Sequence, residues 1–239
     1  MKSTFAKLAA DITAGLNLEI SPIQISYLDS EPLDVARFNG AVPAGCTFWG
    51  MGAENEFYAQ ISTHENCEIG AFVLGITPSG ELLKRLTETL GWMEENGYLG
   101  IGEAEKIPHG SRAPPFIYYG PLGIRNIPPT AVAILCSPQS AMVALEAASI
   151  HRTHPFEIPV TGRPACSVIP FVLAGKAKVA MSLGCAGFRT FVDAAADKVV
   201  IAVRGDALHE FAAAVRQIAG INGEVHRLDL EKRKEFDRR

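Results

Sequence analysis

The sequence predicts an α/β protein in which two diverged α/β repeats pack into one compact body, with mixed sheets flanked by helices. Three observations support this prediction. Segments with helical spacing of apolar residues alternate with short β-branched segments along the chain. A stretch rich in Gly and Pro separates two halves of similar length. Each half also has two cysteines at matching positions.

The bulk composition describes an ordinary globular chain. Its 239 residues are 48% hydrophobic and 20% charged, with a formal charge of -4. The negative net charge provides no overall positive potential to attract nucleic acid, so we expect no nucleic-acid partner. Residues 1–20 lack the continuous apolar run of an export signal. No window reaches the roughly 18 apolar residues of a membrane span. We therefore expect a cytoplasmic protein without a membrane partner.

The first half, residues 1–97, is expected to form the N-terminal repeat. Helical spacing predicts the helices, and apolar runs bounded by Pro, Asp or Gly predict the strands. Ser79 is a suitable N-cap for the last helix. In chain order, the expected elements are a helix to Leu18, a strand over 22–29, a short helix from Cys46, strands over 56–63 and 71–77, and a helix over 79–97.

Residues 98–129 are expected to form a connector rich in Gly and Pro, in which only the segment PFIYYG looks extended. Long loops of this kind often carry function, so Tyr118, Tyr119 and Pro121 are candidates to line a pocket.

The second half, residues 130–239, is expected to form the C-terminal repeat with a charged helical tail. Ser137 at an N-cap and Pro138 at the first helical position mark a helix start. In chain order, we expect a strand over 130–136, a helix over 137–152, an interrupted helix over 164–175, strands over 178–184 and 198–203, and a helix from Asp206.

The two halves share an order of features that indicates an internal duplication. Residues 46–62 and 166–182 align without a gap: a cysteine, a hydroxyl residue, an apolar segment, a turn with Gly, a strand and a serine. The segment FVLGITPSGELLKRL then matches VVIAVRGDALHEFAA. One unit has too few strands to cover both faces of a sheet, so the copies are expected to share a sheet or pack face to face.

Four cysteines are the candidate site residues: Cys46, Cys67, Cys166 and Cys185. Cys46 and Cys166 are expected to open helices, where the helix dipole lowers the pKa of a thiol. Cys67 and Cys185 are expected to follow strand ends. If the halves pack about a pseudo-twofold axis, the four thiols converge into a site suited to an iron–sulfur cluster, zinc or another soft metal. The alternative is that these thiols are core packing residues.

Other side chains are weaker candidates. His64 precedes Cys67 by three residues and is a candidate ligand or general base. Arg189 follows the last of the four cysteines and is a candidate to bind an anionic ligand or cofactor. His151 and His154 have a spacing compatible with one metal ion. Cys136 has no counterpart in the first half and is assigned to the core.

Several motifs together identify a family resemblance. The order GCTFWGMGAE, NCEIG, YYGPLG, CSPQSAMVALEAA, GRPACSVIP and SLGCAGFR resembles the uncharacterised ArCR-type family of bacteria and archaea. The resemblance spans residues 20–220 and is most specific in the second half. It implies that the four cysteines belong together, and it implies no particular activity.

Three functions follow from these patterns. The first is binding of a small ligand or a thiolate-held metal centre between the repeats, with His64 and Arg189 beside the cysteines. The second is an enzyme with an activated cysteine, either Cys67 beside His64 or Cys185 beside Arg189. The third is a non-catalytic interaction module whose cysteines belong to the core. A homo-oligomer is compatible with each of them.

Overall fold

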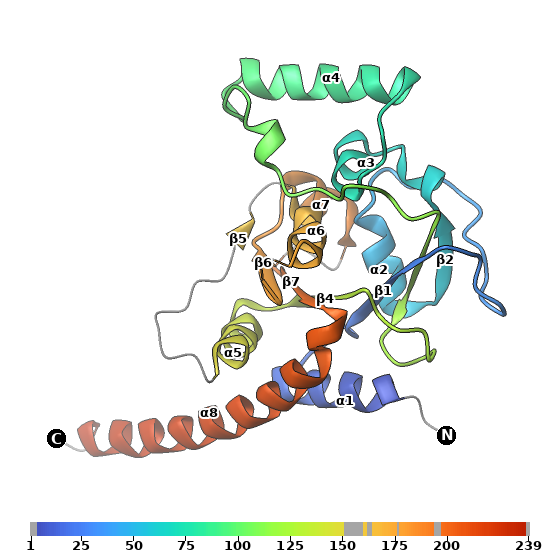
Figure 1. Ribbon diagram of the computed structural model, residues 1–239. Helices are drawn as coiled ribbons and strands as arrows, with labels where there is room; N and C mark the ends of the chain where they lie inside the picture. The colour runs from blue at the N-terminus through green and yellow to red at the C-terminus, as the bar shows by residue number, and fades with distance from the viewer. Residues whose placement is uncertain (1–3, 151–159, 162–163, 176, 194–196, 238–239) are drawn as a thin grey trace.

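The computed structural model (Figure 1) describes residues 4–150, 160–161, 164–175, 177–193 and 197–237. Its mixed α/β architecture confirms the predicted fold class. His151 and His154 lie outside the described residues. The helices are α1 (Thr4–Leu16), α2 (Thr47–Glu54), α3 (Glu68–Leu74), α4 (Gly80–Glu95), α5 (Pro138–Ser149), α6 (Val168–Leu173), α7 (Ala186–Phe191) and α8 (Leu208–Phe236). The strands are β1 (Ile23–Leu28), β2 (Phe57–Gln60), β3 (Phe116–Pro121), β4 (Ala131–Cys136), β5 (Val160–Thr161), β6 (Val179–Ser182) and β7 (Val199–Arg204).

The described strands form one seven-stranded sheet in the order β2-β3-β1-β4-β7-β6-β5. The two halves of the chain meet where β1 pairs with β4, in antiparallel register with Ile23 opposite Ala133. Outward from this pair, β3 and β2 follow on one side and β7 and β6 on the other, each pairing antiparallel with its neighbour. The sheet is mixed because the short edge strand β5 runs parallel to β6.

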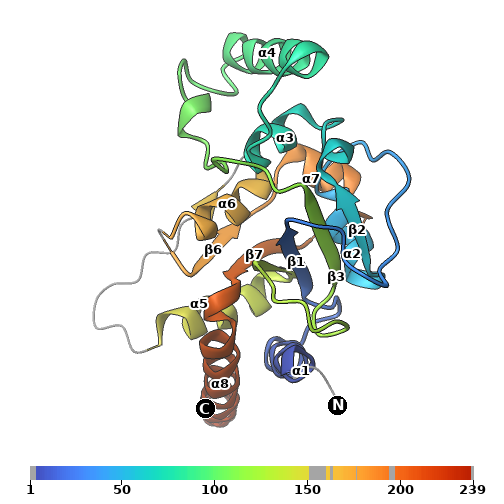
Figure 2. The same ribbon diagram turned by 45° about the vertical axis from the view of Figure 1, so that its right-hand side comes forward.

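Helices cover both faces of this sheet. In Figures 1 and 2, α3, α6 and α7 lie on one side of the sheet, and α1, α5 and α8 lie on the other. The sequence of β4 is a continuous apolar run because all six of its residues are buried. Ala131, Ala133 and Leu135 pack in the core of the α2–α6–α7 face. The alternate residues of β4, ending at Cys136, pack in the core of the α1–α5–α8 face.

Two sequence-based expectations are wrong. The apolar segment over 71–77 is not a strand: most of it belongs to α3, which ends at Gly75 in the left-handed conformation, φ 83°. A short apolar run does not by itself distinguish a buried helix from a strand. The proposed match of FVLGIT to VVIAV therefore pairs a helix with strand β7. Strand β3 lies next to β1 in the sheet, as β7 lies next to β4. It comes from the segment expected to be the connector.

The chain approaches itself closely at the turn between β7 and α8. A Cβ atom on Gly205 would lie 1.8 Å from the carbonyl oxygen of Pro129, and the Gly205 N–H donates to the carbonyl of Thr130 at 2.9 Å. The backbone before β4 leaves no room for a side chain at this position.

We therefore expect Gly205→Ala to lower the free energy of unfolding by about 2 kcal/mol or more, because the backbone must move to accommodate the methyl group. Gly220→Ala is the matched control, since a Cβ there meets nothing within 4 Å in α8. That change should raise stability by roughly 0.5–1 kcal/mol through helix propensity. Urea denaturation followed by circular dichroism measures both, and equal stability of the two variants would contradict the packing described.

Candidate functional site

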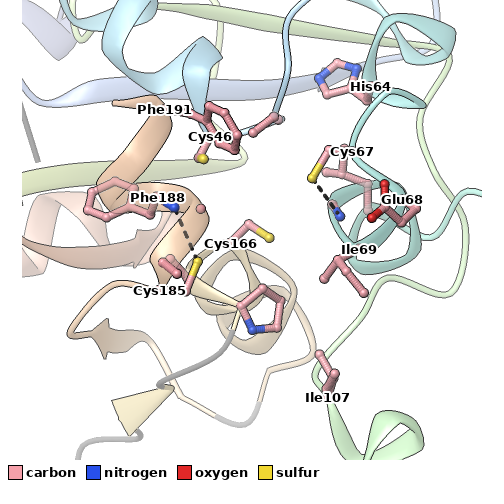
Figure 3. A pocket seen from close by; sticks show the side chains of 18 of the residues that line it. Cys46, His64, Cys67, Glu68, Ile69, Ile107, Cys166, Cys185, Phe188 and Phe191 are labelled. Carbon is pink, nitrogen blue, oxygen red and sulfur yellow. Dashed lines mark hydrogen bonds between the residues drawn. The ribbon is translucent and has the colours of Figure 1, made fainter. Parts of the chain in front are cut away.

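A cavity of about 530 Å³ lies on the α2–α6–α7 face, and all four candidate cysteines line it. Cys46 and Cys67 come from the first half of the chain, and Cys166 and Cys185 from the second. Figure 3 shows the four side chains turned toward a common space, with Cys67 facing the other three from α3. Segments far apart in the sequence therefore place their thiols around one volume.

Cys67 and Cys185 have the same local role. Each is an N-cap whose sulfur accepts from the backbone N–H three residues later: Gly70 N–H at 3.3 Å for Cys67, and Phe188 N–H at 3.5 Å for Cys185. Gly70 suits this contact, because a Cβ there would lie 2.9 Å from the Cys67 sulfur. The capping geometry fixes both sulfurs at the cavity wall.

Cys46 and Cys166 also stand at helix starts, as the sequence predicts. Cys46 immediately precedes α2, and Cys166 lies in a short 3-10 turn, Ala165–Ser167, that leads directly into α6. Both side chains are partly buried and pack against the core of this face. The four cysteines thus stand at the N-termini of four different helices, and these N-termini meet at the same cavity.

Burial determines the protonation of these thiols. Burial, with smaller contributions from the neighbouring Cys67 and Cys185, raises the pKa of Cys46 to about 12. Burial likewise raises the pKa of Cys166 well above its usual value, with contributions from the other three cysteines. The pKa of Cys67 is also raised by burial, although the N–H groups of Gly45 and Gly70 oppose the shift.

These directions correct the expectation that helix ends lower the thiol pKa values, because burial outweighs the local N–H groups for Cys46, Cys67 and Cys166. Without a cationic partner, these three side chains are neutral thiols at physiological pH. Such thiols are poor nucleophiles, which weakens the interpretation of Cys67 as an activated nucleophile.

His64 also lines the cavity and is only 1% exposed. Its Nε2 lies 2.9 Å from the hydroxyl oxygen of Tyr119, so this nitrogen is engaged by Tyr119 rather than by the Cys67 thiol. Burial lowers the pKa of His64 to about 4, against the opposing effect of the carbonyls of Ile61 and Gln60. A neutral imidazole paired with a tyrosine is therefore a polar element in the cavity wall.

Of the other residues predicted from the sequence, some line the cavity and others do not. Arg189 is exposed, donates to the carbonyl of Leu183 and stacks over the Phe188 ring with its guanidinium carbon 5.8 Å from the centroid. It is not among the described residues that line the cavity. Of the connector candidates, Tyr119 lines the cavity, whereas Tyr118 bonds to Glu56 at 3.2 Å. Cys136 is 2% exposed on the opposite face of the sheet, which confirms its assignment to the core.

Sequence reasoning missed one wall of the cavity. This wall comes from the end of α4 and the segment after it, and consists of Trp92, Met93, Tyr98, Leu99 and Ile107. In Figures 1 and 2, α4 lies beyond α3, away from the sheet. The signal in the sequence was Trp92, a large aromatic residue near the end of an amphipathic helix, and the structure leaves its side chain 59% exposed.

Within residues 4–150 and the later described segments, no three His, Cys, Asp or Glu side chains form a group that could hold one metal ion. The four thiols therefore stand around the cavity rather than in a closed single-ion cage. Among the described helices, none combines the length and the apolar character needed to span a bilayer.

The fold and site define a mixed α/β protein with a thiol-lined cavity. Comparison with family models places the chain more specifically: the model for DUF169, described as uncharacterised ArCR, matches residues 11–214. Because this match spans most of the chain, the protein belongs to that family, as the sequence motifs indicate. Comparisons with curated proteins and with solved structures found no match. The family description assigns no activity, so function must be argued from the cavity.

The raised thiol pKa values predict slow alkylation of the metal-free protein. With a pKa near 12 in place of 9, Cys46 has about 1000-fold less thiolate at neutral pH. We expect iodoacetamide to label Cys46 at least about 100-fold more slowly in the native protein than in urea, with the rate rising as the pH increases. Cys67 and Cys166 should also react more slowly in the native protein. Mass spectrometry resolves the individual sites. Rapid native labelling of Cys67 at neutral pH would instead indicate an activated nucleophile.

Proposed function

We propose that the protein holds a thiolate-ligated metal centre in this cavity, with Cys46, Cys67, Cys166 and Cys185 as ligands. An iron–sulfur cluster fits this site best. The supporting observation is that four thiols from separate segments line one cavity and lie close enough for Cys67, Cys46 and Cys185 to raise the pKa of Cys166. Thiolates are the ligands that soft metals and iron–sulfur clusters prefer.

The electrostatics of the thiols support a cationic occupant. Burial and mutual repulsion oppose the thiolate form, and a metal cation at the centre reverses both effects, since metal binding releases thiol protons. The N–H groups of Gly70 and Phe188 already point at the sulfurs of Cys67 and Cys185. Hydrogen bonds of this kind stabilise thiolate ligands and tune the potential of a cluster.

The arrangement of the thiols around the cavity favours a cluster over a single zinc ion. A tetrahedral zinc site, with Zn–S bonds of roughly 2.3 Å, requires sulfurs only about 3.5–4 Å apart. A cubane cluster is larger and separates its cysteine sulfurs by about 6–7 Å. Thiols that surround a cavity without forming a single-ion group suit the larger centre better. The apolar side chains of Trp49, Ile169 and Phe188 would shield such a centre from water.

We also propose that the two halves arose by duplication and that each supplies two of the ligands. The order of strands supports this: an axis through the β1–β4 pair would exchange β1 with β4, β3 with β7 and β2 with β6. Such an axis, perpendicular to the sheet, pairs α2 with α6 and α3 with α7 on the same face. It relates Cys46 to Cys166 and Cys67 to Cys185, whose sulfurs accept equivalent N–H bonds.

The test is anaerobic purification of the full chain, with iron, zinc and acid-labile sulfide measured per chain and visible absorption recorded. We expect stoichiometric iron and sulfide, because four thiolates complete the coordination of a cluster. Each single change to Ser at Cys46, Cys67, Cys166 or Cys185 should lower the retained iron at least about tenfold. Cys136→Ala is the matched control, because this buried thiol lies on the opposite face of the sheet.

Two results would contradict the proposal. The first is wild-type protein that contains neither metal nor sulfide after anaerobic preparation and reconstitution. The second is unchanged metal content in all four cysteine variants. Stoichiometric zinc without iron would keep the thiolate centre and change the metal assigned to it.

A further inference from the structure

We infer that the same cavity binds an uncharged, flat, apolar small molecule between the cysteines and α4, with a hydrogen-bonding group of the ligand directed at the Tyr119–His64 pair. This goes beyond the metal centre, because the α4 wall supplies none of the four thiolates.

The cavity extends well past the cysteines. Its volume of about 530 Å³ lies within the roughly 300–1,000 Å³ typical of pockets for small molecules. The thiols border one part of it, and the second wall comes from α4 and the following segment through Trp92, Tyr98 and Leu99. Trp92 is 59% exposed and Phe191 is 40% exposed, so both wall residues also reach the surface. A ligand could therefore reach the thiols from outside.

Aromatic side chains contribute to several sides of the cavity. Trp49 and Phe188 are buried in its inner wall, with ring centroids 6.1 Å apart. Trp92 and Tyr98 belong to the α4 side, and Phe191 contributes from the end of α7. Aromatic walls favour flat apolar groups, because ring faces and edges pack against them with large contact area. The lining therefore selects for a ring system rather than a sugar or a peptide.

The polar groups of the lining define the charge of the ligand. Among the described lining residues, Glu68 is the acidic side chain, and its carboxylate accepts from the Thr89 hydroxyl at 2.9 Å. A negative charge at this position repels anionic ligands. The buried Tyr119 hydroxyl and His64 Nε2, 2.9 Å apart, offer a neutral hydrogen-bonding pair that can orient one polar group of the ligand.

The test uses two probes that share one ring system, titrated into the full-length protein and followed by fluorescence. Phenyl-naphthylamine is uncharged and has one N–H donor, and anilinonaphthalene sulfonate adds an anionic group. We expect the amine to bind once per chain, with an affinity at least about tenfold higher than that of the sulfonate. Absence of saturable binding of the amine, or tighter binding of the sulfonate, would overturn the inference.

Variants of α4 locate the probe. Trp92→Ala should weaken binding of the amine at least about fivefold, because its ring belongs to the cavity wall. Leu83→Ala is the matched control: Leu83 lies on the same helix, is 49% exposed and is not a lining residue. Circular dichroism checks that both variants fold. Equal effects of the two changes, or none, would place the probe outside this cavity and refute the inference.

The experiment separates this inference from the metal centre when both probes are titrated into metal-free and iron-loaded protein. Binding of the amine by a chain that takes up no metal would support the ligand site and refute the proposed centre. Full iron content without binding of the amine in either form would leave the centre standing and overturn the ligand site.

Discussion

The antiparallel pairing of β1 with β4 is the contact on which the arrangement of the site depends. It joins the first half of the chain to the second in one sheet, with Ile25 opposite Ala131 and Ile23 opposite Ala133. Because side chains alternate along a strand, this register places these apolar residues in the core beneath α2, α6 and α7. The segments that carry the four cysteines are consequently held over the same face of the sheet.

The environment of the thiols explains how an ordinary core could become a site. Buried cysteine packs as a small apolar residue, and the raised pKa values of Cys46, Cys67 and Cys166 reflect that environment. Yet the four side chains turn toward a shared volume, and the sulfurs of Cys67 and Cys185 accept hydrogen bonds from backbone N–H groups. A cation in that volume would convert packing residues into ligands without a change of fold, because the helix starts already fix their positions.

Local sequence patterns predicted much of the fold. Ser137 caps α5 through its hydroxyl, which accepts from the Ser140 N–H at 3.1 Å, and Pro138 begins the helix. The apolar run ending at Cys136 is the fully buried strand β4. The pattern failed where an apolar run was short. Residues 71–74 belong to α3, because the Cys67 cap and the left-handed Gly75 define a helix that hydrophobicity alone does not distinguish from a strand.

The sequence by itself determined most of the element types, the matched cysteines and the family to which the chain belongs. These properties depend on residues a few positions apart, and their spacing can be read from the sequence. Only the tertiary structure decided that Cys46, Cys67, Cys166 and Cys185 share one cavity, that His64 pairs with Tyr119, and that α4 supplies a wall. Those facts depend on strand pairing and burial across the sheet, where desolvation outweighs the local effect of a helix start on a thiol.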